Sequence, residues 1–152
     1  MATVADVADV VGLEARLFEE DAGVHDPHAD VGWPARDGAE DFADLQADPD
    51  AVVLLARADG EAVGLLMAYA ATAGATRQPI RYAVLRSMYV AASHRRAGVA
   101  SALIAEFLGW ARRSDCAEAR VNHYVTNQAA GDLYESFGFA AHSVDRVLPL
   151  RP

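Results

Sequence analysis

The chain has 152 residues, which suffices for one domain with a sizeable core, so we expect residues 1–152 to form a single domain. Its net charge is −9 and it contains no lysine, which disfavours nucleic acid as a partner because phosphate binding needs a basic face. No apolar run approaches the roughly 18 residues that span a membrane, and residues 1–6 lack the pattern of a secretory signal. We therefore expect a folded cytoplasmic protein with no membrane partner.

Acidic and basic residues are separated along the chain. Between Glu14 and Asp50 there are twelve acids and two arginines, whereas the stretch from Arg77 to Arg120 holds eight arginines and three acids. One part is therefore suited to a cation and the other to an anion, although an acidic excess is also the ordinary composition of a solubilising surface. Cys116 is the single cysteine, which excludes an internal disulfide, and the histidines lack metal-binding spacing, so we predict no metal site.

The first fifty residues predict two helices joined by a long connection. Apolar residues at helical spacing predict a helix over 6–20, and a shorter helix follows over 39–47. The connection, residues 21–38, is broken by glycine and proline and carries acids and an aromatic residue, among them Asp21, Asp26 and Trp33. A connection of this length is either part of a functional site or a surface loop whose Trp33 packs onto the core.

Five β-type runs follow, and helical patterns separate the later ones. The runs cover residues 51–57, 61–71, 80–90, 119–125 and 139–150. Asp59-Gly60 between the first two is a strong hairpin signal, and Gly64 indicates a bulge. A helix is expected from Val99 to about Arg113, and another begins after Asn127 as its cap. A meander followed by alternating strands and helices predicts an α/β domain with a mixed sheet.

The turn before the helix at Val99 has the composition of an anion site. The first turn of a helix has backbone N–H groups without intrahelical partners, together with the positive end of the helix dipole. Small residues at Gly98, Ala100 and Ser101 allow a phosphate to approach closely, and Arg95 and Arg96 add fixed positive charge. The sequence therefore predicts phosphate binding at this turn.

Two motifs resemble the signatures of the GNAT superfamily of N-acetyltransferases. The stretch from Arg95 to Ala100 fits (Gln/Arg)-x-x-Gly-x-(Gly/Ala), which resembles the loop that binds the pyrophosphate of acetyl-CoA. About thirty residues later, the stretch from Asn127 to Phe139 is similar to Asn-x-x-Ala-x-x-Leu-Tyr-x-x-x-Gly-Phe, the second signature of that superfamily. The resemblance covers almost the whole chain, and the two motifs stand in the right order and at the right distance.

The resemblance implies a GNAT-like α/β fold and transfer of an acetyl group from acetyl-CoA to an amine. The implied fold is a mixed, mostly antiparallel central sheet flanked by about four helices, with a short or missing first strand because only residues 1–5 precede the first helix. Backbone atoms of the fourth family strand would pair with the pantetheine arm, and Asn127 would bond to it. The implied acetyl-CoA-binding residues are Met88, Tyr89, Val90, Arg95, Arg96, Ala97, Gly98, Val99, Ala100, Ser101, Asn127 and Tyr134.

The resemblance also gives Tyr134 the role of general acid. A phenol remains protonated at neutral pH and can donate its proton to the departing thiolate, whereas the helical pattern alone predicts only a packing role. The resemblance does not supply the base, because Val84 to Ser87 offer no carboxylate where many relatives have a glutamate. Candidates are His123, an acid of the group Glu19, Glu20 and Asp21, or a water chain.

We expect the acceptor to be a small cationic amine, since acids dominate the first fifty residues. Asp21, Asp26, Trp33 and Asn122 are the predicted acceptor-binding residues. The Trp33-Pro34 pair among acidic residues resembles a feature of aminoglycoside 6′-acetyltransferases within the superfamily. An aminoglycoside is therefore one possible acceptor, beside polyamines, amino acids and protein N-termini. The alternative function is a GNAT-like module that binds acyl-CoA without transfer, and a homodimer is one option for the assembly.

Overall fold

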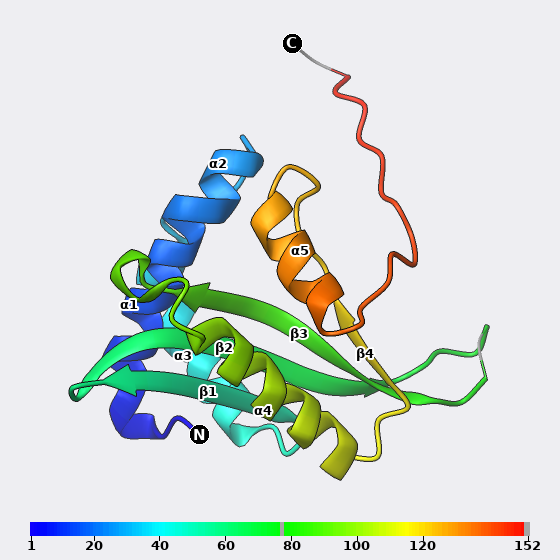
Figure 1. The fold of residues 1–152 in the computed structure, drawn as a ribbon, viewed down its shortest axis with the longest axis horizontal. Helices are drawn as coiled ribbons and strands as arrows, with labels where there is room; N and C mark the ends of the chain where they lie inside the picture. The colour runs from blue at the N-terminus through cyan, green and yellow to red at the C-terminus, as the bar shows by residue number, and fades with distance from the viewer. Residues whose placement is uncertain (77, 151–152) are drawn as a thin grey trace.

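The computed structural model describes residues 1–76 and 78–150 of the chain (Figure 1). Its helices are α1 (Val7–Leu17), α2 (Gly23–His25), α3 (Trp33–Ala47), α4 (Val99–Arg113) and α5 (Gln128–Ser136), with short helical turns η1 (Val4–Asp6), η2 (Phe18–Ala22) and η3 (Ala92–His94). Its strands are β1 (Ala51–Ala58), β2 (Glu61–Thr72), β3 (Arg81–Val90) and β4 (Glu118–Val121). None of the helices in the described residues is long and apolar enough to cross a membrane.

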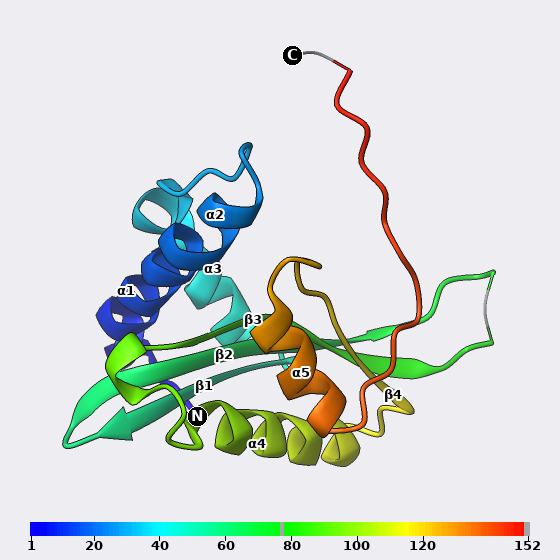
Figure 2. The same ribbon diagram turned by 45° about the horizontal axis from the view of Figure 1, so that its top comes forward.

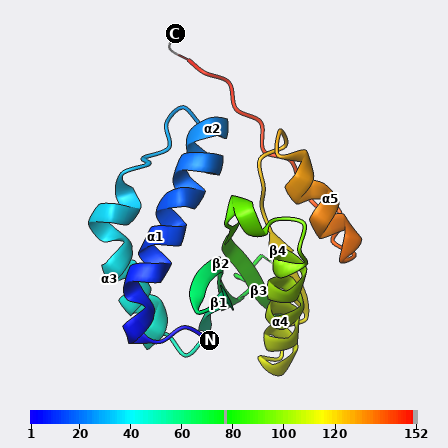
Figure 3. The same cartoon turned by 60° about the vertical axis from the view of Figure 1, so that its left-hand side comes forward.

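The strands form one mixed sheet in the order β1-β2-β3-β4. The pairs β1–β2 and β2–β3 are antiparallel, and β3–β4 is parallel. Helices α1 and α3 cover one face of the sheet and α4 and α5 the other, as Figure 3 shows. This arrangement confirms the expected α/β class and the mixed, mostly antiparallel sheet flanked by helices.

Apolar residues on both faces of the central strands explain the long apolar runs of the sequence. Along β2, Leu65 and Met67 pack under α1 and α3, while Leu66 and Ala68 pack under α4. Successive side chains of a strand point to opposite faces, so a strand covered on both faces needs apolar residues at every position. Phe42 and Phe107 are the largest fully buried side chains of the two layers.

The predicted hairpin and bulge are confirmed. Asp59 and Gly60 have positive φ angles of 50° and 88°, as a tight turn between β1 and β2 requires. The register shifts by one residue where Ala56 pairs with Gly64. A Cβ at Gly64 would lie 3.0 Å from Cγ1 of Val99, so glycine here lets α4 approach β2 closely.

The first two helices are longer than predicted, and the connection between them is shorter. The helix predicted over 6–20 continues from α1 through the π-helical turn η2 and through α2 to His25. The helix predicted over 39–47 begins at Trp33, because Pro34 is tolerated in a first turn, where its missing N–H has no partner. The irregular connection is therefore residues 26–32 and not 21–38.

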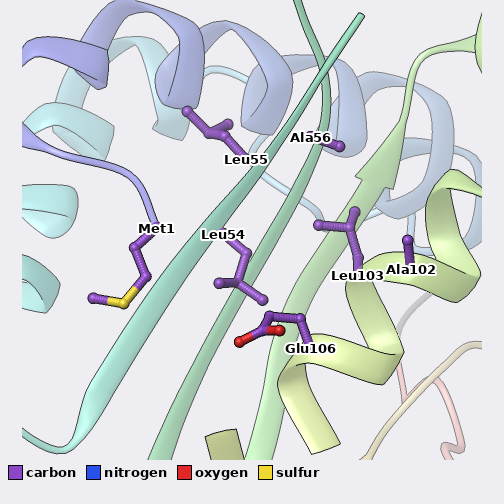
Figure 4. Close-up of a pocket in the computed structure, with 7 residues that line it drawn as sticks. All are labelled: Met1, Leu54, Leu55, Ala56, Ala102, Leu103 and Glu106. Carbon is purple, nitrogen blue, oxygen red and sulfur yellow. The ribbon is translucent and has the colours of Figure 1, made fainter. Parts of the chain in front are cut away.

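A first strand is missing among the described residues, in agreement with the prediction of a short or missing one. One backbone hydrogen bond takes its place, from the amide of Ala2 to the carbonyl of Val53 at 2.8 Å. Beside it lies a small hollow of about 250 Å³ between β1 and α4, lined among others by Met1, Leu54 and Glu106 (Figure 4). The sheet therefore begins with β1.

The last two predicted strands are wrong in whole or in part. The strand predicted over 119–125 ends at Val121, because the chain turns away from β3 there. The strand predicted over 139–150 is not formed: the segment has no regular structure and leaves the domain (Figures 1 and 2). Strand preference reflects packing against a neighbouring strand, and in a single chain this segment lies beside none.

Candidate active site

Strands β3 and β4 diverge halfway along β3. Their last paired residues are Leu85 and Val121. Beyond this point β3 still pairs with β2 through Met88, Tyr89 and Val90. The opposite edge of this part of β3 is flanked by no strand of the described residues, so its backbone N–H and C=O groups can pair with an extended amide chain.

The turn after β3 presents unpaired amides at the start of α4. Arg96 and Gly98 have positive φ angles of 63° and 82°, and Gly98 is the residue before the helix. The amide of Ala102 is the first that bonds back to the carbonyl of Gly98, at 3.0 Å. The amides of Val99, Ala100 and Ser101 therefore have no intrahelical acceptor, which is the arrangement that binds phosphate.

The two arginines of this turn differ in their surroundings. Nε of Arg95 donates to the carbonyl of Val90 at 2.9 Å, and its guanidinium also binds the carboxylate of Glu20. The hydroxyl of Tyr89 donates to the same carboxylate at 2.7 Å. Arg96 is exposed and forms no ion pair within the described part of the chain. Arg95 thus braces the turn, and Arg96 is the arginine available to an anion.

Glu20 is consequently unsuited to act as a base. The hydrogen bonds from Tyr89 and Arg95 hold the pKa of the Glu20 carboxyl below its usual value. Burial and the bond to Glu20 in turn raise the pKa of the Tyr89 phenol. The phenol of Tyr89 packs in the layer under α1, so only backbone atoms of this residue face the unpaired edge of β3.

Asp21 follows Glu20 in the π-helical turn η2, but its carboxylate contacts a different part of the chain. Nδ2 of Asn127 donates to Oδ1 of Asp21 at 2.7 Å, and Nε2 of His25 lies 3.5 Å from the same oxygen. His25 also bonds through Nδ1 to the hydroxyl of Thr126 at 2.6 Å and stacks on Tyr124. The end of the first long helix is therefore tied to the connection between β4 and α5.

Asn127 caps α5 as predicted, because its Oδ1 accepts from the amide of Ala130 at 3.1 Å. Its amide group is engaged with Asp21 at the same time. The bond to the acetyl-CoA arm that the family resemblance implies would replace or share this contact, and it remains a prediction.

Tyr134 lies at the centre of the site. Its side chain is 6% exposed and packs edge-on against Phe139 and obliquely against His123, both at 5.9 Å between ring centroids. Burial, with a contribution from the charge of Asp21, raises the pKa of the Tyr134 phenol to about 12. Its hydroxyl is hydrogen-bonded to no other group of the described residues, so the proton is free for a ligand.

His123 lies in the connection after β4, not on the predicted strand. Its Nδ1 is 2.9 Å from the carbonyl of Tyr124, and a carbonyl can only accept, so Nδ1 carries the proton. In the neutral ring Nε2 then has a free lone pair. A Cβ on Gly131 would lie 3.1 Å from Cε1 of His123, so this glycine gives the imidazole room beside α5.

A cavity of about 580 Å³ joins several of these groups. It lies between β4, α5 and the chain that follows α5, and its lining includes Asn122, His123, Gly131, Tyr134 and Phe139. Asn122, predicted to bind the acceptor, thus lies beside the two predicted catalytic side chains. The two predicted catalytic residues and Asn122 therefore line one cavity.

The remaining predicted acceptor residues lie in the connection or at its end. Trp33 stacks on Phe18 with 5.6 Å between ring centroids, which agrees with a packing role. Oδ1 of Asp26 accepts from the amide of His28 at 2.9 Å and so shapes its own loop. The negative charge of Asp26 also helps to raise the pKa of the Tyr124 phenol, after burial. The charge of Asp21 contributes to the same shift, so both carboxylates lie on the Tyr124 side of the site.

Sequence reasoning missed a charged cluster on the opposite face of the sheet. Arg86 of β3 donates to Asp41 at 2.9 Å, to Glu14 at 3.4 Å and to the sulfur of Met67 at 3.1 Å. Glu14 is 1% exposed, and its second carboxylate oxygen has no partner in the described residues. The available signal was a glutamate within the apolar stripe of α1 and an arginine within an apolar strand.

Comparisons with known proteins agree with this geometry. The family model described as Acetyltransferase (GNAT) family matches residues 15–139. An aminoglycoside N(6′)-acetyltransferase type 1 from Acinetobacter haemolyticus is 30% identical over 141 residues, covering 91% of this chain and 87% of the relative.

Solved structures share the fold. A mutant protein from Bacillus halodurans superposes with a TM-score of 0.89 at 16% identity, covering 99% of this chain and 97% of that one. A complex of the aminoglycoside N-acetyltransferase AAC(6′)-Iy with CoA has a TM-score of 0.75 at 20% identity, covering 99% and 91%. With the family match over most of its length and both signature motifs placed around one site, this chain belongs to the GNAT family and is an acyl-CoA-dependent acetyltransferase.

Proposed function

We propose that this enzyme transfers the acetyl group of acetyl-CoA to a primary amine of a small cationic molecule, with an aminoglycoside as the first substrate class to test. The observation that carries the proposal is the carboxylate of Asp21, which accepts from Nδ2 of Asn127 at 2.7 Å at the start of α5, the helix that carries Tyr134. A carboxylate at this end of α5 suits an ammonium group that must arrive next to the thioester. The 30% identical aminoglycoside acetyltransferase supports the same acceptor class.

In this proposal acetyl-CoA lies along the unpaired edge of β3 and ends at the first turn of α4. The amides of Val99, Ala100 and Ser101 bind the pyrophosphate, and the guanidinium of Arg96 adds a charge-assisted bond. Backbone groups of Met88 and Val90 pair with the amides of the pantetheine arm. A backbone N–H in this stretch also stabilises the oxyanion that develops on the thioester.

Tyr134 supplies the proton to the departing sulfur. Its pKa of about 12 keeps the phenol protonated throughout the neutral and mildly alkaline range, so the acid is always in its active form. Burial of most of the ring lowers the local polarity, which strengthens the hydrogen bond that the phenol would donate to the sulfur.

His123 takes the proton from the amine, and Asp21 holds the ammonium before that step. The lone pair on Nε2 of His123 follows from the bond that its Nδ1 makes to Tyr124, and the two rings of His123 and Tyr134 are adjacent. Glu20 is excluded as the base by its two hydrogen bonds, because both stabilise the carboxylate and lower its proton affinity. His123 thus removes one proton from the ammonium and frees its lone pair for attack. After attack the nitrogen gives its second proton to Tyr134 as the phenol donates its own proton to the departing sulfur.

The test is release of the CoA thiol from acetyl-CoA in the presence of aminoglycosides, polyamines, amino acids and short peptides. We expect release with aminoglycosides, and mass spectrometry of the product should show one added acetyl group. Asp21→Asn should raise KM for a cationic acceptor by about tenfold or more, which is a larger effect than any on KM for acetyl-CoA through the bond to Asn127. Asp59→Asn, in the β1–β2 turn, is the matched control and should change neither. Equal KM values for wild type and Asp21→Asn would contradict the role of Asp21.

A further inference from the structure

Strand β3 is irregular at the point where it separates from β4. Leu85 pairs with Ala68 of β2, and Ser87 pairs with the neighbouring Met67. Arg86 lies between them and pairs with no residue of β2, so one residue is inserted into β3, which is the pattern of a β-bulge. Leu85 is also the last residue of β3 that pairs with β4. The bulge therefore begins the part of β3 whose other edge carries no strand of the described residues.

The bulge reverses the alternation of side chains along β3. Before it, the odd-numbered Leu85 packs in the layer under α4. After it, the even-numbered Met88 and Val90 pack in that layer, while Tyr89 packs under α1. In a regular strand all odd-numbered side chains share one face, so without the inserted residue Tyr89 would point toward α4. Its phenol would then lose the hydrogen bond to Glu20.

Two helices hold the side chain of the inserted residue. The guanidinium of Arg86 donates two hydrogen bonds to the carboxylate of Asp41 on α3, at 2.9 and 2.5 Å, and one to the sulfur of Met67 at 3.1 Å. Glu14 of α1 lies 3.4 Å from the same guanidinium. Two parallel bonds to one carboxylate fix both the position and the orientation of a guanidinium. The residue that has no partner in the sheet is thus fixed by the helices that cover it (Figure 3).

We propose that Arg86 is a positioning residue, which holds the bulge and thereby sets the edge of β3 that receives the pantetheine arm. Backbone N–H and C=O groups alternate along a strand together with its side chains, so the inserted residue also decides which amides of Met88 to Val90 face the free edge. Without the bulge the edge would present groups about 3.3 Å away along the strand. This inference rests on the placement of acetyl-CoA proposed above.

The test compares two ligands by calorimetry. One is CoA, and the other is its nucleotide part, adenosine 3′-phosphate 5′-diphosphate, which lacks the pantetheine arm. Arg86→Met removes the guanidinium but keeps an unbranched side chain. It should weaken CoA binding at least about tenfold and binding of the nucleotide part less than about twofold, because the turn before α4 is unchanged. A general loss of folded protein would act on both ligands alike.

Arg81→Met is the matched control. Arg81 also lies on β3, and its side chain is 30% exposed and binds the carboxylate of Asp50 at 2.5 Å. It pairs with Thr72 in the regular part of the strand, before the bulge, so its loss should leave the ratio of the two affinities unchanged. Asp41→Asn weakens the main bond of Arg86 and should change the ratio in the same direction as Arg86→Met, by a smaller factor. Arg86→Lys keeps the charge and should restore part of the ratio.

Equal losses of both affinities in Arg86→Met, or no loss of either, would overturn the role of Arg86. A ratio that changes as much in Arg81→Met would overturn it as well, because any lost ion pair of β3 would then suffice. If Arg86→Met does not fold, Asp41→Asn and Arg86→Lys provide the same comparison. A wild type that binds CoA no more tightly than the nucleotide part would refute the proposed placement of the arm and, with it, this inference. Neither ligand contains an acceptor, so the result is independent of the proposed amine.

Discussion

Replacing Glu14 by glutamine should stabilise the protein at neutral pH. Glu14 is 1% exposed on α1, one of its oxygens lacks a partner in the described residues, and its nearest cation, Arg86, lies 3.4 Å away and is shared with Asp41. Burial, which outweighs the attraction of Arg86, raises the pKa of the Glu14 carboxyl from 4.5 to about 6. A carboxyl with a raised pKa favours the folded state only while it is protonated.

The size and pH dependence of the effect follow from this shift. A difference of about 1.5 pKa units corresponds to roughly 2 kcal/mol, since one unit is worth about 1.36 kcal/mol. The contribution of Glu14 is fully present below pH 4.5 and is lost as the pH rises through 6. Glu14→Gln mimics the protonated acid at all pH values. It should therefore add about 2 kcal/mol, or about 4–8 °C in Tm, at pH 7.5 and almost nothing at pH 4.5.

Thermal unfolding of wild type and Glu14→Gln from pH 4.5 to 7.5 measures this difference. Glu40→Gln, an exposed position on α3, is the control for the loss of one negative charge and should show no comparable trend. If Glu14→Gln lowers Tm at pH 7.5, the ion pair with Arg86 outweighs the cost of burying the carboxylate, and our reasoning is wrong. A gain that is the same at every pH would exclude ionisation as its cause.

Three further predictions concern catalysis. Tyr134→Phe should lower kcat by about 10²- to 10⁴-fold and leave the affinity for CoA, measured by calorimetry, unchanged. An unchanged kcat would show that the tyrosine only packs in the core. Arg96→Ala should weaken CoA binding by about 10- to 100-fold, because it removes one charge-assisted hydrogen bond, and equal affinity would show that Arg96 does not face the phosphates. His123→Gln should lower kcat at least about a hundredfold without weakening CoA binding. Full activity would show that water or Asp21, and not His123, accepts the proton of the amine.

Local sequence signals predicted the elements on which the site is built. The hairpin at Asp59-Gly60, the turn with Gly98 and the cap at Asn127 each follow from short-range rules, and all three are confirmed. Backbone conformation at such positions depends on a few neighbouring residues, which a single sequence contains.

Contacts between distant segments could not be predicted in this way. Asp21 and Asn127 are 106 positions apart, and Glu20 and Arg95 are 75 apart, so no local pattern links them. The π-helical turn that separates the two carboxylates also has no sequence signature of its own. The strand predicted over 139–150 failed for a related reason, since a strand forms only where a partner is present.

The two neighbouring carboxylates of η2 explain how the site is held before either substrate binds. Glu20 fixes Arg95 and with it the turn before α4, while Asp21 fixes Asn127 at the start of α5, the helix that carries Tyr134. One helical turn therefore positions the two family motifs relative to each other across the diverging strands. A rigid placement of this kind lowers the ordering cost of binding. Because Asp21 is also the proposed anchor of the acceptor ammonium, binding of the amine acts on the same bond network that positions α5.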